Sequence, residues 1–228
     1  MSRTILFRSP NLPYHVCAHS NNKDWFYLPT KEVWTIFSKL LGKVATDFSI
    51  RIHAFVLMSN HFHALVTTPD ENLDTAMLYF MRESAREINK KLGSINSIFT
   101  EPYQWSLITH RRYYEHAIRY VYQNPLKAGI VSRVENYFFS TLSHLYSKRK
   151  LPFSISESVF DRQGVMDLAL WQKIHYLNSL YTKEENDCIR RALGHPVFRL
   201  KKSKYVNPTR AQPKKQSKTE MKNLLHYG

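Results

Sequence analysis

Two histidines one residue apart, His61 and His63, have the side-chain type and spacing that could chelate a divalent metal. A short polar break at Ser59–Asn60 separates the apolar run before them from the apolar run that contains them. This pattern predicts two strands joined by a tight turn. Because side chains alternate along a strand, both imidazoles would project from one face, and Phe62 would point to the other.

The spacing of the two histidines is a weak motif when taken alone. The chain contains 11 histidines, and chance would place such a pair in about one of two chains of this kind. A pair of half-exposed strand histidines that bind nothing is therefore the alternative. Other residues have to decide between the two interpretations.

Further along the chain, Tyr120 lies on a predicted helix over about residues 113–123, and Asn124 follows four residues later at its last turn. The helix must stop near Asn124, because Pro125 disfavours helical geometry in the residue before it. The spacing puts both side chains on one face. If that face packs on the histidines, Asn124 would offer a carbonyl oxygen as a third metal ligand.

Tyr120 would then be a nucleophile toward a phosphodiester whose phosphate the metal polarises. A phenol has a pKa near 10, so a cation or a base must lie close to help it react. Simple packing is the alternative role for a tyrosine in an aromatic-rich helix. Spacing alone does not distinguish it from three neighbours: Tyr113, Tyr114 and Tyr122.

The charge balance favours a polyanionic partner. The chain has 33 Lys and Arg against 18 Asp and Glu, so its formal charge is +15, and its pI is near 9.8. Residues 199–228 carry +8 of this charge, which leaves the first 198 residues at +7. Nucleic acid is the simplest polyanion that fits, and the 14% aromatic content could supply stacking on bare bases.

Cysteine usage and hydropathy indicate a cytoplasmic protein. Cys17 and Cys188 are far apart and lack a metal-type spacing, which favours a reducing compartment. No apolar run approaches the roughly 18 residues that cross a bilayer, and the first four residues lack a signal-peptide pattern. We therefore expect a soluble, cytoplasmic protein without a membrane partner.

The predicted elements alternate in a recognisable order. A strand over residues 14–18 precedes a helix that opens near Thr30, and the two histidine strands follow. A second helix over about 73–92 and a strand over 103–109 complete the set. The order strand, helix, strand, strand, helix, strand predicts an α+β fold, a ferredoxin-like antiparallel sheet with helices on one face.

The chain is predicted to divide into three segments of different composition. Residues 1–148 form the predicted catalytic domain, and 149–198 a small helical appendage with helices over 166–180 and from Thr182 to Gly194. The appendage is either a DNA-binding accessory or a structural brace across the core. The basic tail 199–228 is rich in Lys, Ser, Gln and Pro and is expected to be disordered when free.

Both motifs together resemble those of the single-tyrosine HUH transposases, enzymes of the insertion-sequence type that act on single-stranded DNA. His61-Phe62-His63 after a Met-Ser-Asn turn resembles the HUH motif (His, bulky hydrophobe, His). The segment 119–131 is similar to the tyrosine-helix signature, in which Arg-Tyr precedes Asn-Pro and then a basic-Ala-Gly step. The similarity is greatest to the REP-associated tyrosine transposases. Residues 14–16 and 137–143 also fit, so that it covers about residues 10–148.

This resemblance implies a metal-dependent DNA endonuclease and strand transferase. It selects Tyr120 as the nucleophile, which would form a 5′-phosphotyrosine link and release a 3′-hydroxyl that can later attack the link. It implies that His61, His63 and Asn124 hold Mg²⁺ or Mn²⁺, whereas ligand chemistry alone also allows zinc. It further implies recognition of hairpin DNA at element ends.

Basic residues near the motifs are candidates for phosphate contacts, with solvated helix faces as the alternative. Five arginines are predicted to bind DNA: Arg119, Arg111, Arg112, Arg82 and Arg86. Three further histidines could approach the site but are expected in core or surface roles: His53, His110 and His116.

Two other functions remain open at this point. One is a metal-dependent nuclease that uses water, with Tyr120 incidental, and a trapped protein–DNA adduct would exclude it. The other is a noncatalytic binder of hairpin DNA or RNA that keeps only the fold. Monomeric and homodimeric states are equally open.

Overall fold

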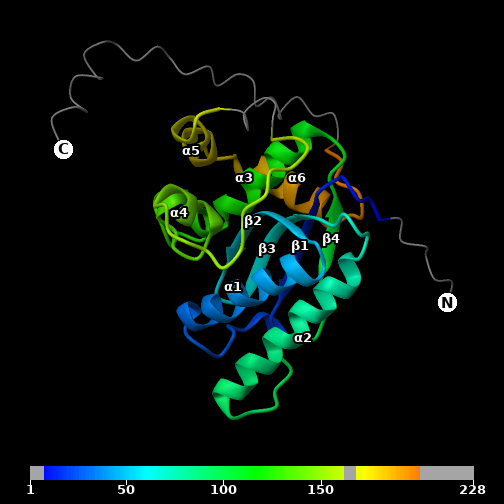
Figure 1. Ribbon diagram of the computed structural model, residues 1–228. Coiled ribbons are helices and arrows are strands. Elements are labelled where there is room, and N and C mark those ends of the chain that lie inside the picture. The colour runs from blue at the N-terminus through cyan, green and yellow to red at the C-terminus, as the bar shows by residue number, and fades with distance from the viewer. Residues whose placement is uncertain (1–7, 162–167, 201–228) are drawn as a thin grey trace.

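The computed structural model describes residues 8–161 and 168–200, and its centre is a four-stranded antiparallel sheet (Figure 1). The strands are β1 (Tyr14–His19), β2 (Arg51–Leu57), β3 (His61–Thr67) and β4 (Gln104–Leu107), in the order β2-β3-β1-β4. Helix α1 (Thr30–Asp47) connects β1 to β2, and α2 (Leu73–Leu92) connects β3 to β4. This confirms the predicted ferredoxin-like arrangement.

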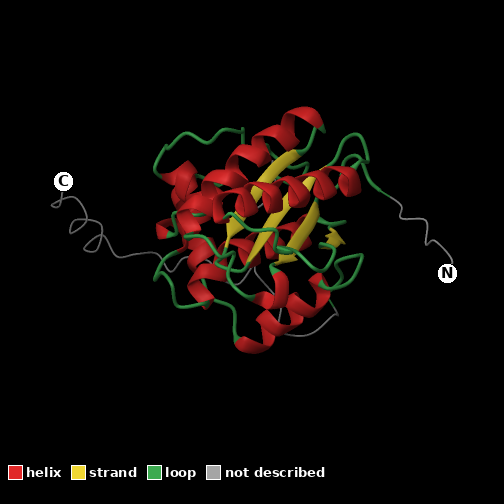
Figure 2. Cartoon of the chain, turned by 90° about the horizontal axis from the view of Figure 1, so that it is seen from below, coloured by secondary structure: helices red, strands yellow, loops and turns green. Residues whose placement is uncertain are grey.

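The sheet lies between two layers of helices (Figures 1 and 2). On one face, α1 and α2 pack over apolar strand residues such as Phe55 and Phe62, both fully buried. On the other face, Ala54, Val56 and Leu65 pack against α3 (Arg111–Lys127). Because β3 alternates, the face opposite Phe62 is the histidine face, so α3 covers the histidines as the hypothesis requires.

Helix α3 is longer than the sequence indicates, since it runs through Pro125 to Lys127. The prediction that it stops near Asn124 was therefore wrong. A proline in a helix removes the N–H that would bond the carbonyl four residues earlier, here that of Val121. The side chain of Asn124 offsets this loss, because its Nδ2 donates to the carbonyl oxygens of Tyr120 at 2.9 Å and Val121 at 3.3 Å.

The segment after residue 148 shares the core of the first 148 residues. Helices α5 (Leu170–Asn178) and α6 (Lys183–Leu193) pack on α3. Ile155 pairs with Ile52 at the β2 edge, and Val197 pairs with Leu107 at the β4 edge. Both edges of the sheet are thus covered. This packing fits the interpretation of the segment as a brace.

The observed ends of several helices can be compared with the predicted ones. Helix α1 begins at Thr30 with Pro29 as its N-cap, and α6 has the predicted capping box of Thr182 and Glu185 and ends at Gly194. A short helix, α4 (Thr141–Tyr146), was not predicted. Part of the predicted helix 166–180 and the tail from 201 to 228 fall outside the described residues. No helix among the described residues is long and apolar enough to cross a membrane.

Candidate active site

Strand β3 brings the two histidines together on the face that α3 covers. The ring centroids of His61 and His63 are 5.0 Å apart, with the planes at 85°. Phe62 between them is fully buried in the core under α1 and α2, so the alternation expected of a strand is observed.

The hydrogen bonds of His61 leave one ring nitrogen available for a metal. Its Nδ1 lies 2.7 Å from the carboxamide Oδ1 of Asn60, and the Nδ2 of Asn60 donates to the carbonyl oxygen of Lys23 at 2.6 Å. A carboxamide oxygen can only accept, so Nδ1 of His61 carries the proton and Nε2 keeps its lone pair.

Burial keeps both histidines neutral, which is the form that binds metals. Desolvation lowers the pKa of His61 to about 4. The pKa of His63 lies well below its ordinary value, first because of burial and then because of the neighbouring His15. Neither ring carries a charge at neutral pH.

Tyr120 lies directly against this pair. Its ring centroid is 5.6 Å from that of His63, in an edge-to-face arrangement. Burial raises the pKa of Tyr120 to about 12, so the phenol is protonated at neutral pH and needs help to react. The Nζ of Lys127 lies 4.2 Å from the centroid of the Tyr120 ring and supplies a nearby cation.

Asn124 follows Tyr120 by one turn of α3. Both donor interactions of its amide nitrogen go back to its own helix, and within the described chain its Oδ1 accepts no hydrogen bond. The described residues contain no group of three His, Cys, Asp or Glu side chains that could hold a metal ion. Two imidazole nitrogens and the carboxamide oxygen of Asn124 are nevertheless a chemically suitable donor set for a divalent ion.

Strand β1 contributes polar side chains that the sequence analysis did not select. Cys17 is paired with His63 in the sheet, and His19 with His61, whose ring centroid is 4.8 Å away. His15 contacts His63, and burial raises the pKa of Cys17 to about 12, so that it remains a thiol. The alternation His15-x-Cys17-x-His19 is a period-2 signal that could have placed all three on one strand face.

Arg119 is the predicted DNA contact that the structure places inside the protein. It is 6% exposed, and its guanidinium lies 3.7 Å from the ring centroid of Tyr181 and 5.0 Å from that of Tyr176. It also donates to the carbonyl oxygen of Ser179. In this conformation Arg119 anchors α5 and the loop after it to α3, and it has no access to a DNA phosphate.

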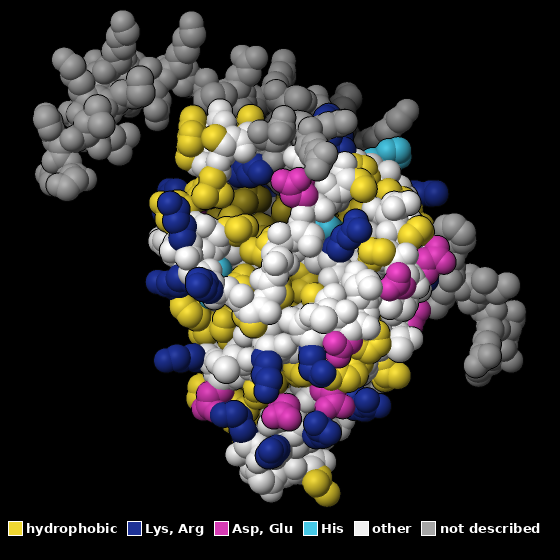
Figure 3. Space-filling view, in the orientation of Figure 1, with side chains coloured by type: hydrophobic (Ala, Val, Ile, Leu, Met, Phe, Trp, Pro, Cys, Tyr) yellow, Lys and Arg dark blue, Asp and Glu magenta, His cyan; other side chains and the backbone are white. Residues whose placement is uncertain are grey.

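The other four arginines lie on two different sides of the molecule. Arg111 and Arg112 are exposed at the start of α3, where the Nε of Arg111 is 3.8 Å from Glu115. Arg82 and Arg86 are exposed on α2, across the sheet from the histidines, and both pair with Glu83. Figure 3 shows basic side chains along the left flank of one face, and basic and acidic side chains mixed at its lower end.

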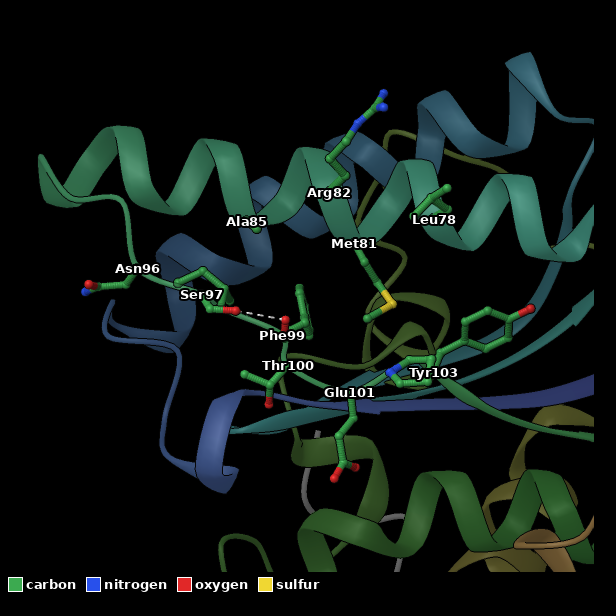
Figure 4. Close-up of a pocket in the computed structure, with 12 residues that line it drawn as sticks. Leu78, Met81, Arg82, Ala85, Asn96, Ser97, Phe99, Thr100, Glu101 and Tyr103 are labelled. Carbon is green, nitrogen blue, oxygen red and sulfur yellow. Dashed lines mark hydrogen bonds between the residues drawn. The ribbon is translucent and has the colours of Figure 1, made fainter. Parts of the chain in front are cut away.

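A groove of about 410 Å³ lies between α2 and residues 96–103. Figure 4 shows Met81 pointing into it and Arg82 pointing away from it. None of the predicted catalytic or metal-binding residues lines this groove, which belongs to the α2 side of the sheet.

The three further histidines considered from the sequence, His53, His110 and His116, have structural placements. His53 is bonded through Nδ1 to the carbonyl oxygen of Ser156 at 2.8 Å and through Nε2 to Thr67 at 2.7 Å. His116 contacts the hydroxyl of Tyr181 at 2.7 Å, and His110 is the N-cap of α3. These placements agree with the core and surface roles expected for them.

The antiparallel sheet thus sets His61 and His63 against Tyr120 of the helix that covers it. The profile of the family described as "Transposase IS200 like" matches residues 9–124, and the chain belongs to this family. It is therefore an enzyme of the transposase type.

Known proteins similar to the chain include a curated relative and a solved structure. A "REP-associated tyrosine transposase" from Escherichia coli K12 is 28% identical over 120 residues, which are 52% of this chain and 70% of the relative. A solved structure of a REP-associated tyrosine transposase bound to a REP hairpin matches with a TM-score of 0.53 and 21% identity. That match covers 69% of this chain and 93% of the other, and it shows a shared fold.

Proposed function

We propose that the chain cleaves and rejoins single-stranded DNA at hairpin-associated sites, with Tyr120 as the nucleophile. The observation that carries this proposal is the contact of the Tyr120 ring with His63, beside His61. Residues from two motifs far apart in the sequence meet at one place on the sheet.

In the cleavage step, the phenolic oxygen of Tyr120 attacks the phosphorus and the bond from phosphorus to the 3′ oxygen breaks. The phenol loses its proton and the departing 3′ oxygen takes one up. The products are a 5′-phosphotyrosine link and a free 3′-hydroxyl. A 3′-hydroxyl that later attacks the link restores the phenol, so joining needs no external energy source.

The chain's own residues prepare this step. The ammonium of Lys127 lies over the Tyr120 ring and stabilises the negative charge that develops as the phenol loses its proton. His61, His63 and Asn124 would hold Mg²⁺ or Mn²⁺ through two imidazole nitrogens and a carboxamide oxygen. When bound, the metal polarises the scissile phosphate and offsets its charge.

Hairpin DNA is the partner that the relative's structure and the charge of +15 support. Arg111 and Arg112 remain candidate phosphate contacts, since both are exposed at the start of the helix that carries Tyr120. Arg82 and Arg86 could contact only DNA that reaches the α2 side. Arg119 is not proposed as a phosphate contact, because its side chain is buried.

The test is incubation of the chain with single-stranded DNA hairpins and Mn²⁺, followed by denaturing electrophoresis. The wild type is expected to form a covalent protein–DNA adduct and Tyr120→Phe none. Tyr113→Phe, on the same helix, is the matched control and should still form the adduct. An adduct with Tyr120→Phe contradicts the proposal.

The same experiment separates the two alternative functions. Cleavage without an adduct, unchanged in Tyr120→Phe, would indicate a nuclease that uses water. Binding of the hairpin without cleavage in the presence of Mn²⁺ would indicate a noncatalytic binder.

A further inference from the structure

A second imidazole lies behind His63 in the sheet. His15 on β1 is 4% exposed, and its Nε2 is 3.0 Å from the Nδ1 of His63. The planes of the two rings are inclined by 28° with the centroids 5.2 Å apart, and the ring of His15 is also 6.2 Å from that of Tyr120. His15 therefore contacts both a candidate metal ligand and the candidate nucleophile.

One proton lies between the two facing nitrogens, and its position decides what His63 can do. If Nδ1 of His63 carries the proton and donates to His15, the Nε2 of His63 keeps a lone pair. If Nε2 of His15 donates instead, neutral His63 must be protonated at its own Nε2. That tautomer has no lone pair there to offer a metal.

We propose that His15 is a positioning residue, which accepts the Nδ1–H of His63 and so presents the Nε2 lone pair of His63 to the metal. This inference rests on the proposed function, since it assigns His63 as a ligand. His61 provides the precedent within the same site, because its Nδ1 faces the Oδ1 of Asn60, which can only accept. Both histidines then have an acceptor at Nδ1 and a lone pair at Nε2.

The surroundings of His15 indicate which of its two ring nitrogens the proposed role requires. Its Nδ1 is buried and has no hydrogen-bond partner among the described residues. An unpaired buried nitrogen does not favour folding, so an apolar residue would serve packing better at this position. The functional requirement is therefore an acceptor at the place of Nε2, which the carbonyl oxygen of a glutamine can supply.

The test measures Mn²⁺ affinity by electron paramagnetic resonance in the full chain without DNA. His15→Leu is expected to bind Mn²⁺ roughly 10- to 100-fold more weakly than the wild type, the usual effect of losing the partner of a metal-bound histidine. His15→Gln should stay within about threefold of the wild type, because it restores the acceptor. His63→Ala establishes that the ion is bound at this site.

His53→Leu is the matched control. His53 is buried to the same 4% as His15 and makes two hydrogen bonds, but its bonds go to Ser156 and Thr67 and not to His63. Its loss should lower stability and leave Mn²⁺ affinity unchanged. This control separates an effect on the metal site from a general loss of packing.

A second readout does not depend on the metal or on the variants. In metal-free wild-type protein, the imidazole ¹⁵N resonances of His63 should show a protonated Nδ1 and a bare Nε2. The opposite tautomer overturns the inference.

The outcomes distinguish this inference from the function it rests on. Wild-type affinity in His15→Leu, or equal loss in His15→Leu and His15→Gln, overturns the role of His15 alone. A wild type that binds no Mn²⁺, or binds it equally in His63→Ala, contradicts the proposed metal site and this inference with it.

Discussion

The ring of Tyr120 stands edge-on to the ring of His63, with the centroids 5.6 Å apart and the planes at 82°. One residue is on α3 and the other on β3, so the contact depends on how α3 is seated on the sheet. Apolar residues of β2 and β3 pack against α3 on the sheet side, and α5 and α6 also pack against α3. Changes in these contacts should therefore affect Tyr120 even where they do not touch it.

Replacing Arg119 by leucine should weaken the attachment of α5 to α3. The change removes a guanidinium 3.7 Å from the Tyr181 ring and its hydrogen bonds to Ser179. We expect the free energy of unfolding to fall by about 2 to 4 kcal/mol, the combined size of a cation–π contact and a charged hydrogen bond. Urea unfolding measures this loss.

Arg82→Leu is the control for that prediction, since Arg82 is exposed and pairs only with a neighbouring glutamate within the described chain. Its effect on stability should stay within about 1 kcal/mol. If Arg119→Leu keeps its stability and loses hairpin affinity instead, Arg119 is a phosphate contact and its buried placement does not describe the DNA-bound protein.

Lys127 should matter for the rate of cleavage through its charge. Its Nζ lies 4.2 Å from the centroid of the Tyr120 ring, and a contact of this kind is worth about 0.5 to 2 kcal/mol. Lys127→Met is therefore expected to slow adduct formation roughly 2- to 30-fold. Lys127→Arg keeps the cation and should react close to the wild-type rate. Equal rates for the lysine and methionine forms would remove Lys127 from the mechanism.

Local patterns were sufficient to predict the placement of His61 and His63, because strand alternation depends on neighbours in the sequence. The span of α2 was likewise readable from helical periodicity, and it runs over Leu73–Leu92 as expected. The contact of Tyr120 with His63 required a further hypothesis, that α3 packs on the histidine face. Periodicity identifies an apolar helix face but not the surface it covers.

The features that were missed depend on long-range packing. His15 meets His63 only through the register of β1 against β3, which no local pattern shows. Arg119 looked like a surface arginine because its aromatic partners, Tyr176 and Tyr181, come from a distant segment. The continuation of α3 through Pro125 depends on a side-chain hydrogen bond of Asn124, which propensity does not predict.

Gly42→Ala should destabilise the protein although alanine favours helices by about 1 kcal/mol. A Cβ at position 42 of α1 would lie 2.7 Å from the carbonyl oxygen of Pro152, which is backbone and cannot rotate away. We expect the free energy of unfolding to fall by about 1 to 3 kcal/mol. Thr46→Ala, at an exposed position of the same helix, should be neutral or slightly stabilising. A stabilising Gly42→Ala would show that residues near 152 do not pass over α1 in solution.

Stability should fall as the pH drops below 6.5, because buried histidines are held neutral, among them three that are not proposed metal ligands. Burial lowers the pKa of His15 to about 3 and the pKa values of His53 and His116 to about 4. Between pH 6.5 and 4 the unfolded chain takes up protons that the folded chain does not, so this contribution to stability is complete above pH 6.5 and is lost on acidification. Each such histidine accounts for about 1.4 kcal/mol per pH unit at most.

Urea unfolding of the metal-free protein at pH 7, 6 and 5 measures this dependence. His53→Gln removes one of these groups, so the slope of the free energy of unfolding against pH should decrease by up to about 1.4 kcal/mol per pH unit, the equivalent of one proton. The comparison is informative because His53 lies away from His63, so the variant leaves the contact of His15 with His63 in place. A free energy of unfolding that stays level from pH 7 to pH 5 would mean that these imidazoles are accessible to protons, and the neutral state assigned to His15 would then be wrong.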